Sequence, residues 1–157
     1  MDRFHFFSHL NKALDNQRKN LRRQFKDQEE FKRLKWALLK NAEDLTDDQR
    51  RKLNQVFLLA PQLKVFYESK EKFRLIFNQR LTREQGEVEL NQWIEEANKM
   101  KNKYLNQFLC TLNNWKEYVL NYFTHRYTTS IIEGINNSIK TVKRMGYGFR
   151  NFANFKQ

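Results

Sequence analysis

The residues with the clearest potential for chemistry lie near the C-terminus, around a lone carboxylate. After Glu117 the only acidic residue is Glu133, and the surrounding segment is rich in Lys and Arg. If residues 133–144 form a helix, an acid, two amides and two cations fall at i, i+3, i+4, i+7 and i+11 and share one face. The residues on that face are Glu133, Asn136, Asn137, Lys140 and Arg144. One reason for a carboxylate in such a cationic segment is the binding of a metal ion beside a phosphate backbone.

The same pattern has a purely structural interpretation. Ser130 and Glu133 are spaced as in a capping box, in which Glu133 would only accept a hydrogen bond from the Ser130 backbone amide. Either Thr129 or Ser130 can cap the helix, and Gly146 follows two cations at its end, as at many helix C-termini. The face opposite the polar stripe can be buried, because it carries Ile135, Ile139 and Val142. The residues alone leave both interpretations of Glu133 open.

Other reactive residues are scarce. The three histidines, with one cysteine, cannot form a zinc site of the usual spacing, and His5 and His9 at i, i+4 lack the glutamate of an HExxH motif. The glycines do not form a phosphate-binding loop. Cys110 lies in an apolar helical pattern, which predicts a small core residue and a reducing compartment. These observations predict no hydrolase triad and no zinc centre.

Composition and charge narrow the class of protein further. A chain of 157 residues predicts one globular unit, and four Gly with one Pro favour helices over an all-β fold. A net charge of +12 and a pI near 9.9 indicate a polyanionic partner, with nucleic acid favoured over an anionic membrane surface. Neither a signal peptide nor a membrane-spanning stretch is evident, so we expect a cytoplasmic protein that does not bind membranes.

The spacing of apolar residues predicts a succession of amphipathic helices. The exposed face of the first helix is basic around Lys19, Arg22, Arg23 and Lys26, which fits either a solvated face or a phosphate-contacting patch. Thr46 with Gln49 and Thr82 with Gln85 form capping boxes, and Pro61 can open a helix. The last helix before residue 126 is expected to bury Trp115 with its apolar neighbours. The expected helices cover about 7–25, 29–40, 46–59, 61–77, 82–97, 101–123 and 133–144, with a possible short strand at the extreme N-terminus.

The C-terminal segment resembles a known family. EGINNSIKTVKRMGYGFRNFANF, residues 133–155, is similar to the C-terminal signature of bacterial DDE transposases of the ISL-three family, in which EG, NN, IK, KR, YGFR and NF occur in the same order and spacing. At the other end, Asp2 and His5 resemble the C/D-x-x-H motif of related transposases. One departure is that Thr129-Ser130 stands where the family usually has Asn-Gly.

The resemblance implies an architecture. Residues 1–125 would be a helical insertion region with a remnant of the catalytic core at its start. Residues 126–157 would be a C-terminal catalytic-core segment. The fold class of this chain would then be all-α, with the C-terminal helix belonging to a ribonuclease-H-like core whose sheet is not in this sequence.

The resemblance also implies roles for residues. Glu133 would be the last carboxylate of the DDE triad and a Mg²⁺ ligand, and the two catalytic aspartates would lie upstream of Met1. DNA contacts, or supports of the active-site helix, would come from Asn136, Asn137, Lys140, Lys143, Arg144 and Arg150. The partners would be transposon ends and target DNA, with a homo-oligomer or a mixed oligomer with full-length transposase. Alone, the chain is expected to be inactive; the alternative is a non-enzymatic basic helical module that binds nucleic acid or regulates transposition.

Overall fold

A computed structural model describes residues 3–25, 31, 34–125 and 130–145, and divides the chain after Arg126 into a helical unit and a second unit. The first four elements of the helical unit are α1 (Arg3–Gln24), α2 (Lys35–Leu39), the short 3-10 helix η2 (Ala42–Asp44) and α3 (Asp47–Leu59). They are followed by α4 (Pro61–Asn78), α5 (Arg83–Lys99), α6 (Lys103–Asn114) and α7 (Lys116–His125). The second unit contains α8 (Ser130–Met145). All regular elements in these described ranges are helical, which confirms the predicted all-α class.

Local sequence signals set several helix ends. Thr46 and Gln49 form a complete capping box before α3, and Thr82 and Gln85 form another before α5, as predicted. Pro61 stands at the start of α4, where its missing N–H costs nothing. A fourth signal, not predicted, is Asn102, whose side chain accepts hydrogen bonds from the backbone amides of Tyr104 and Leu105 at the start of α6.

Two predicted helices are shorter in the structure. Among the described residues of the segment expected as one helix over 29–40, α2 begins only at Lys35 and ends at Leu39. The helix expected over 101–123 is divided at Trp115 into α6 and α7. The apolar spacing carried no sign of this division, because Leu112 and Val119 are seven residues apart and both remain buried. Trp115, predicted to be buried, is instead 38% exposed and packs beside Tyr118.

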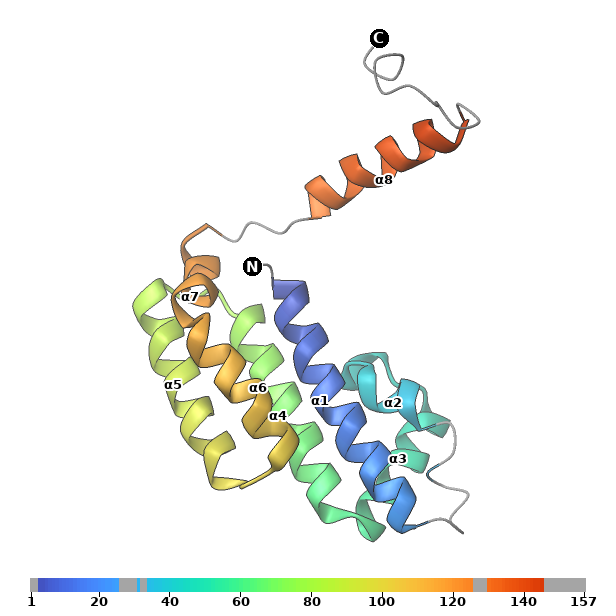
Figure 1. The fold of residues 1–157 in the computed structure, drawn as a ribbon. Helices are drawn as coiled ribbons and strands as arrows, with labels where there is room; N and C mark the ends of the chain where they lie inside the picture. The colour runs from blue at the N-terminus through green and yellow to red at the C-terminus, as the bar shows by residue number, and fades with distance from the viewer. Residues whose placement is uncertain (1–2, 26–30, 32–33, 126–129, 146–157) are drawn as a thin grey trace. The chain divides into compact units, whose positions relative to one another are not determined.

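The core of the helical unit is built around aromatic rings. Helix α1 packs against α2, α4 and α6, while α5 packs against α4, α6 and α7 (Figure 1). Phe73 of α4 lies at the junction, with ring centroids 5.4 Å from Phe7, 4.6 Å from Trp93 and 5.6 Å from Phe108. These contacts join α1, α4, α5 and α6 in one hydrophobic core, in the offset and edge-on geometries that aromatic rings prefer.

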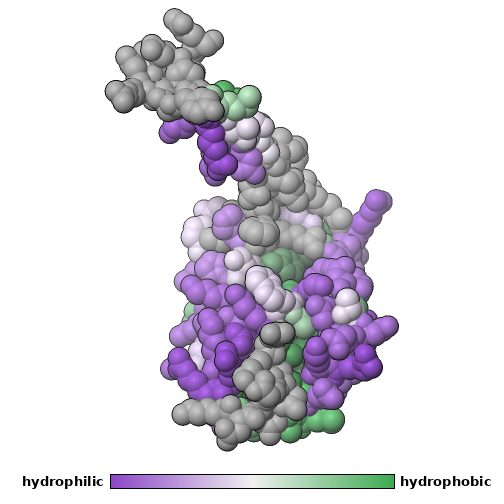
Figure 2. All heavy atoms as spheres, turned by 90° about the vertical axis from the view of Figure 1, so that its right-hand side faces the viewer, coloured by the Kyte–Doolittle hydropathy of each residue, from purple (hydrophilic) through white to green (hydrophobic). Residues whose placement is uncertain are grey.

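The surface of the helical unit is mixed. Figure 2 shows the side occupied by α2 and α3, where hydrophilic residues cover both flanks and hydrophobic residues reach the surface between them. Trp36 of α2 and Leu58 of α3 are largely exposed. Cys110 is also exposed, so its predicted place in the core is wrong; it lies on the outer side of α6, whose buried side carries Leu105, Leu109 and Leu112. Among the described helices, none combines the length and the hydropathy needed to cross a membrane.

Candidate functional site

Helix α8 is the element that positions the candidate site residues. It spans Ser130–Met145 and so contains the predicted helix over 133–144. The helical backbone places Glu133, Asn136, Asn137, Lys140 and Arg144 on one face, since they fall at i, i+3, i+4, i+7 and i+11. Five of the predicted DNA-contacting residues lie in α8, and all five are exposed: Asn136, Asn137, Lys140, Lys143 and Arg144.

The polar groups of α8 are compatible with binding an anion. Lys143 and Arg144 lie in the last turn, where cations interact favourably with the carbonyl end of the helix. The hydroxyls beside the polar face are used within the helix: Ser138 donates to the Gly134 carbonyl at 2.9 Å and Thr141 to the Asn137 carbonyl at 2.9 Å. The exposed amides and cations therefore remain the groups that present hydrogen-bond donors to solvent.

The apolar face of α8 is not buried. Ile135, Ile139 and Val142 are 55%, 45% and 56% exposed, so the described residues do not cover the face that the sequence indicates can be buried. The physical reason is that an amphipathic helix needs a second element against which to bury its apolar face. Helix α8 is the only regular element among the described residues of its unit.

The other predicted site residues lie outside α8 in the sequence. Asp2, Arg150, Thr129 and Gly146 lie outside the described residues. His5 is an exposed residue of α1 and belongs to the helical unit. The geometry that the structure provides for the candidate site is thus that of α8 by itself, and the roles of all these residues remain predictions.

The described residues do not supply a complete metal site. Mg²⁺ in proteins is bound by carboxylates together with carbonyls, waters or substrate phosphates. Within the described part of the chain, no three His, Cys, Asp or Glu side chains gather where they could hold a metal ion. The described residues therefore do not by themselves supply the ligands of a Mg²⁺ site.

A buried ionic network in the helical unit was missed by sequence analysis. Lys70 of α4 is 3% exposed and donates to the carbonyls of Leu38 at 3.0 Å and Lys40 at 2.7 Å, at the C-terminal end of α2. Its ammonium also lies 2.8 Å from a carboxylate oxygen of Glu71. The other oxygen of Glu71 accepts from the Ala42 amide, and Arg74 pairs with both Glu71 and Glu43. The network fastens α2 and η2 to α4.

Burial sets the electrostatics of this network. Desolvation lowers the pKa of Lys70 despite its pairing with Glu71. Desolvation opposes ionisation of Glu71, yet the hydrogen bond from Lys70 and its positive charge lower the pKa of that carboxyl overall. Burial, together with the charge of Glu71, raises the pKa of Tyr67 to about 12. Residues 38–43 and 70–74 are far apart in the sequence, and no periodic pattern links them. The sequence alone therefore gave no sign of the network.

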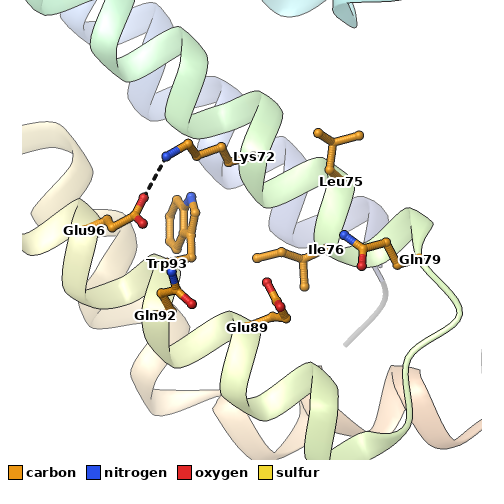
Figure 3. Close-up of a pocket in the computed structure, with 8 residues that line it drawn as sticks. All are labelled: Lys72, Leu75, Ile76, Gln79, Glu89, Gln92, Trp93 and Glu96. Carbon is orange, nitrogen blue, oxygen red and sulfur yellow. Dashed lines mark hydrogen bonds and ion pairs between the residues drawn. The ribbon is translucent and has the colours of Figure 1, made fainter.

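The structure also has a groove between α4 and α5, shown in Figure 3. Its volume is about 260 Å³, and Lys72 and Glu96 form an ion pair of 2.9 Å across it. The Trp93 indole lies in the wall and donates its N–H to the Ser69 carbonyl at 2.8 Å. The remaining lining residues are Leu75, Ile76, Gln79, Glu89 and Gln92. The lining contains no Ser, Thr, Cys or His, and its Lys72 ammonium is paired with the Glu96 carboxylate.

Comparisons with known proteins place the chain in a family. The family model for ISL3 DDE transposases, described as "Transposase", matches residues 1–157. The chain is 34% identical over 122 residues to the transposase for insertion sequence element IS1001 of Bordetella parapertussis, covering 77% of this chain and 30% of that protein. It is 29% identical over 121 residues to the transposase for insertion sequence element IS1557 of Mycobacterium tuberculosis, covering 77% and 27% respectively.

These comparisons also define what the chain represents. It spans less than a third of the length of the curated relatives that it matches. No solved structure is significantly similar to it. Because the family model matches the chain from its first residue to its last, this chain belongs to the ISL3 family of DDE transposases.

Proposed function

We propose that this chain is the C-terminal part of a transposase, and that it contributes Glu133 as the third carboxylate of a DDE active site. Residues 1–125 form the helical insertion region, with a remnant of the catalytic core at its start, and residues 126–157 form the C-terminal catalytic-core segment. The observation that carries the proposal is the family match over the whole chain, combined with the position of Glu133 in a helix whose polar face holds amides and cations.

The proposed reaction is Mg²⁺-dependent hydrolysis and strand transfer of phosphodiesters, with transposon ends and target DNA as substrates. The chemistry of Mg²⁺ would be Lewis-acid stabilisation of charge at the reacting phosphate. The contribution of this chain is to hold Glu133 on a rigid helix and to place donors beside it. Asn136, Asn137, Lys140 and Arg144 follow on the same face, where they suit the phosphate oxygens of a DNA backbone.

The exposed apolar face of α8 supports the same proposal. In the complete enzyme, Ile135, Ile139 and Val142 would pack on the sheet of a ribonuclease-H-like core, so that the opposite, polar face points to the active site. Helix α8 has the amphipathic form required for this, and the rest of the chain does not need to cover it. The two aspartates of the triad, and the sheet, are assigned to sequence outside these 157 residues.

The test replaces the matching segment of the IS1001 transposase with residues 1–157 and measures transposition. The chimera carrying Glu133→Gln should lose activity by about a hundredfold or more, because a neutral amide binds a divalent cation poorly. The matched control is Glu95→Gln, which removes an exposed glutamate from α5 and should leave activity unchanged. Retention of activity by the Glu133→Gln chimera would contradict the proposal.

A second candidate function is non-enzymatic. The chain has a net charge of +12 and spans under a third of the length of its relatives. As a regulator, it would form mixed oligomers with a full-length transposase and lower the activity of that transposase. Coexpression of the chain with the complete transposase separates the two functions. A regulator should reduce transposition equally well with Glu133 or with Glu133→Gln, whereas absence of any reduction would remove this candidate.

A further inference from the structure

The exposed face of α1 carries a continuous basic stripe in the helical unit. Lys12, Lys19 and Arg23 are exposed and fall within an arc of about 40° on a helix with 3.6 residues per turn. Asn16 lies on the same side of the helix between them. We define these three cations, Lys12, Lys19 and Arg23, as the α1 stripe.

The stripe has no competing negative charge on its own helix. Asp15 is the one acidic residue of α1, and it is 7% exposed. Its carboxylate is held by Arg18 at 2.7 Å and by Lys19 at 3.0 Å, and although burial opposes ionisation, these hydrogen bonds lower its pKa overall. The Lys19 side chain remains 57% exposed, so its pairing with Asp15 holds it in place without removing it from solvent.

Charge is distributed unevenly over the helical unit. Helix α1 carries six Lys and Arg against one Asp, whereas α5 carries five Glu against one Arg and one Lys. Helix α1 packs on α2, α4 and α6, and α5 packs on α4, α6 and α7, so the two charged helices lie on different sides of the shared core (Figure 1). A molecule with this separation presents α1 to a polyanion and turns α5 away from it.

We propose that the α1 stripe is a second contact surface for the backbone of duplex DNA, separate from α8. The inference rests on the proposed function, because it names DNA as the polyanion that the complete transposase handles. Lys12 and Arg23 are eleven residues apart, which corresponds to about 16 Å along the helix. Because one strand of B-DNA carries a phosphate about every 3.4 Å of axis, the stripe spans roughly five base-pair steps. The contact is to phosphates and carries no sequence preference.

The experiment measures binding of the complete 157-residue chain to a labelled 20-base-pair duplex by fluorescence anisotropy between about 50 and 200 mM salt. The test variant is Lys12→Gln/Lys19→Gln/Arg23→Gln. The matched control, Arg51→Gln/Lys64→Gln/Arg80→Gln, removes the same charge from exposed positions of α3, α4 and the segment after α4. Thermal unfolding followed by circular dichroism checks that both variants remain folded, which matters because Lys19 pairs with Asp15.

The test variant should weaken duplex binding by roughly tenfold and should flatten the slope of log affinity against log salt by about 0.9 for each lost phosphate contact. The control should change both quantities much less. Equal losses in the test and control variants would overturn the proposal, because they would show a response to net charge alone. Unchanged binding by the test variant, or no measurable binding by the native chain, would also overturn it.

Further measurements distinguish this inference from the proposed function and from membrane binding. If Lys140→Gln/Lys143→Gln/Arg144→Gln in α8 abolishes duplex binding while the α1 variant does not, the α1 proposal fails and the proposed function stands. If Glu133→Gln leaves the chimeric transposase active while the α1 variant loses DNA binding, the proposed function fails and the α1 proposal stands. Binding to vesicles that contain phosphatidylserine tests the alternative partner, an anionic membrane surface. If the α1 variant loses binding to these vesicles but keeps its binding to the duplex, the stripe is a membrane contact and the proposal is overturned.

Discussion

Two glycines show how one residue type can have opposite structural roles. Gly86 in α5 is buried, and a Cβ built there would lie 2.5 Å from Cδ2 of Phe123, whose ring stacks on Phe77 with centroids 5.3 Å apart. Gly134 in α8 has nothing within 4 Å of the same position. The close approach of Phe123 from α7 therefore requires that residue 86 carry no side chain.

We therefore expect Gly86→Ala to lower the free energy of unfolding by about 1–2 kcal/mol, because overpacking outweighs the gain in helix propensity. Urea unfolding measures the change. Gly134→Ala is the control and should increase helicity without destabilising the protein, since alanine favours an exposed helix by about 0.5–1 kcal/mol. Equal effects of the two substitutions would contradict the packing of Phe123 on Gly86.

Glu71 provides a test that depends on pH. Its pKa is lowered in the folded state, chiefly by Lys70 against the opposing effect of burial, so it stabilises the fold fully above about pH 4.3, the ordinary value for glutamate. This stabilisation is lost as the pH falls through the lowered folded-state pKa. Glu71→Gln should thus be less stable than the native protein at about pH 6 and should lose less stability on acidification to about pH 3. Parallel pH profiles for the two proteins would contradict this role of Glu71.

At the scale of elements, the two units should respond differently to loss of apolar residues. Leu105 in α6 is fully buried, whereas Ile139 in α8 is 45% exposed. Leu105→Ala should lower the free energy of unfolding by about 2–5 kcal/mol, because it removes buried methyl groups and leaves a cavity. Ile139→Asp should leave the unfolding of the helical unit unchanged, as judged by thermal denaturation. A comparable loss of stability with Ile139→Asp would mean that α8 contributes to the core.

The elements also show what the sequence could and could not predict. Capping residues and Pro61 located the starts of α3, α4 and α5, because these signals act through the neighbouring backbone. The division at Trp115 and the short α2 were missed, because the apolar spacing continues past both. Cys110 was misplaced for a related reason: periodicity gives the position of a face only to within a residue or so, and Cys110 is adjacent to buried Leu109.

The candidate site was predictable in part. The spacing of apolar and polar residues predicted the helix around Glu133. The order of the motif residues predicted the family. The exposure of the apolar face of α8 was not predictable from the sequence, because burial depends on the element that covers a face. The same limit applies to the network of Lys70, whose partners lie some thirty residues earlier in the chain.

At the scale of the whole molecule, charge and family membership indicate the same partner. The chain carries +12, α1 carries six Lys and Arg against one Asp while α5 is acidic, and the relatives of the chain are transposases. These features support the proposal that the chain contacts DNA as part of a transposase. The central claim is that Glu133 is the ligand it contributes.

The most direct measurement of that claim is metal rescue in the transposase chimera carrying residues 1–157. A thiolate is a poor ligand for Mg²⁺ and a better one for Mn²⁺. Glu133→Cys should therefore abolish strand transfer with Mg²⁺ and regain it with Mn²⁺, while Glu133→Ala should stay inactive with both. Activity of Glu133→Cys in Mg²⁺ equal to that of the native residue, or rescue of Glu133→Ala by Mn²⁺ to the same extent, would contradict a role for Glu133 in binding the metal.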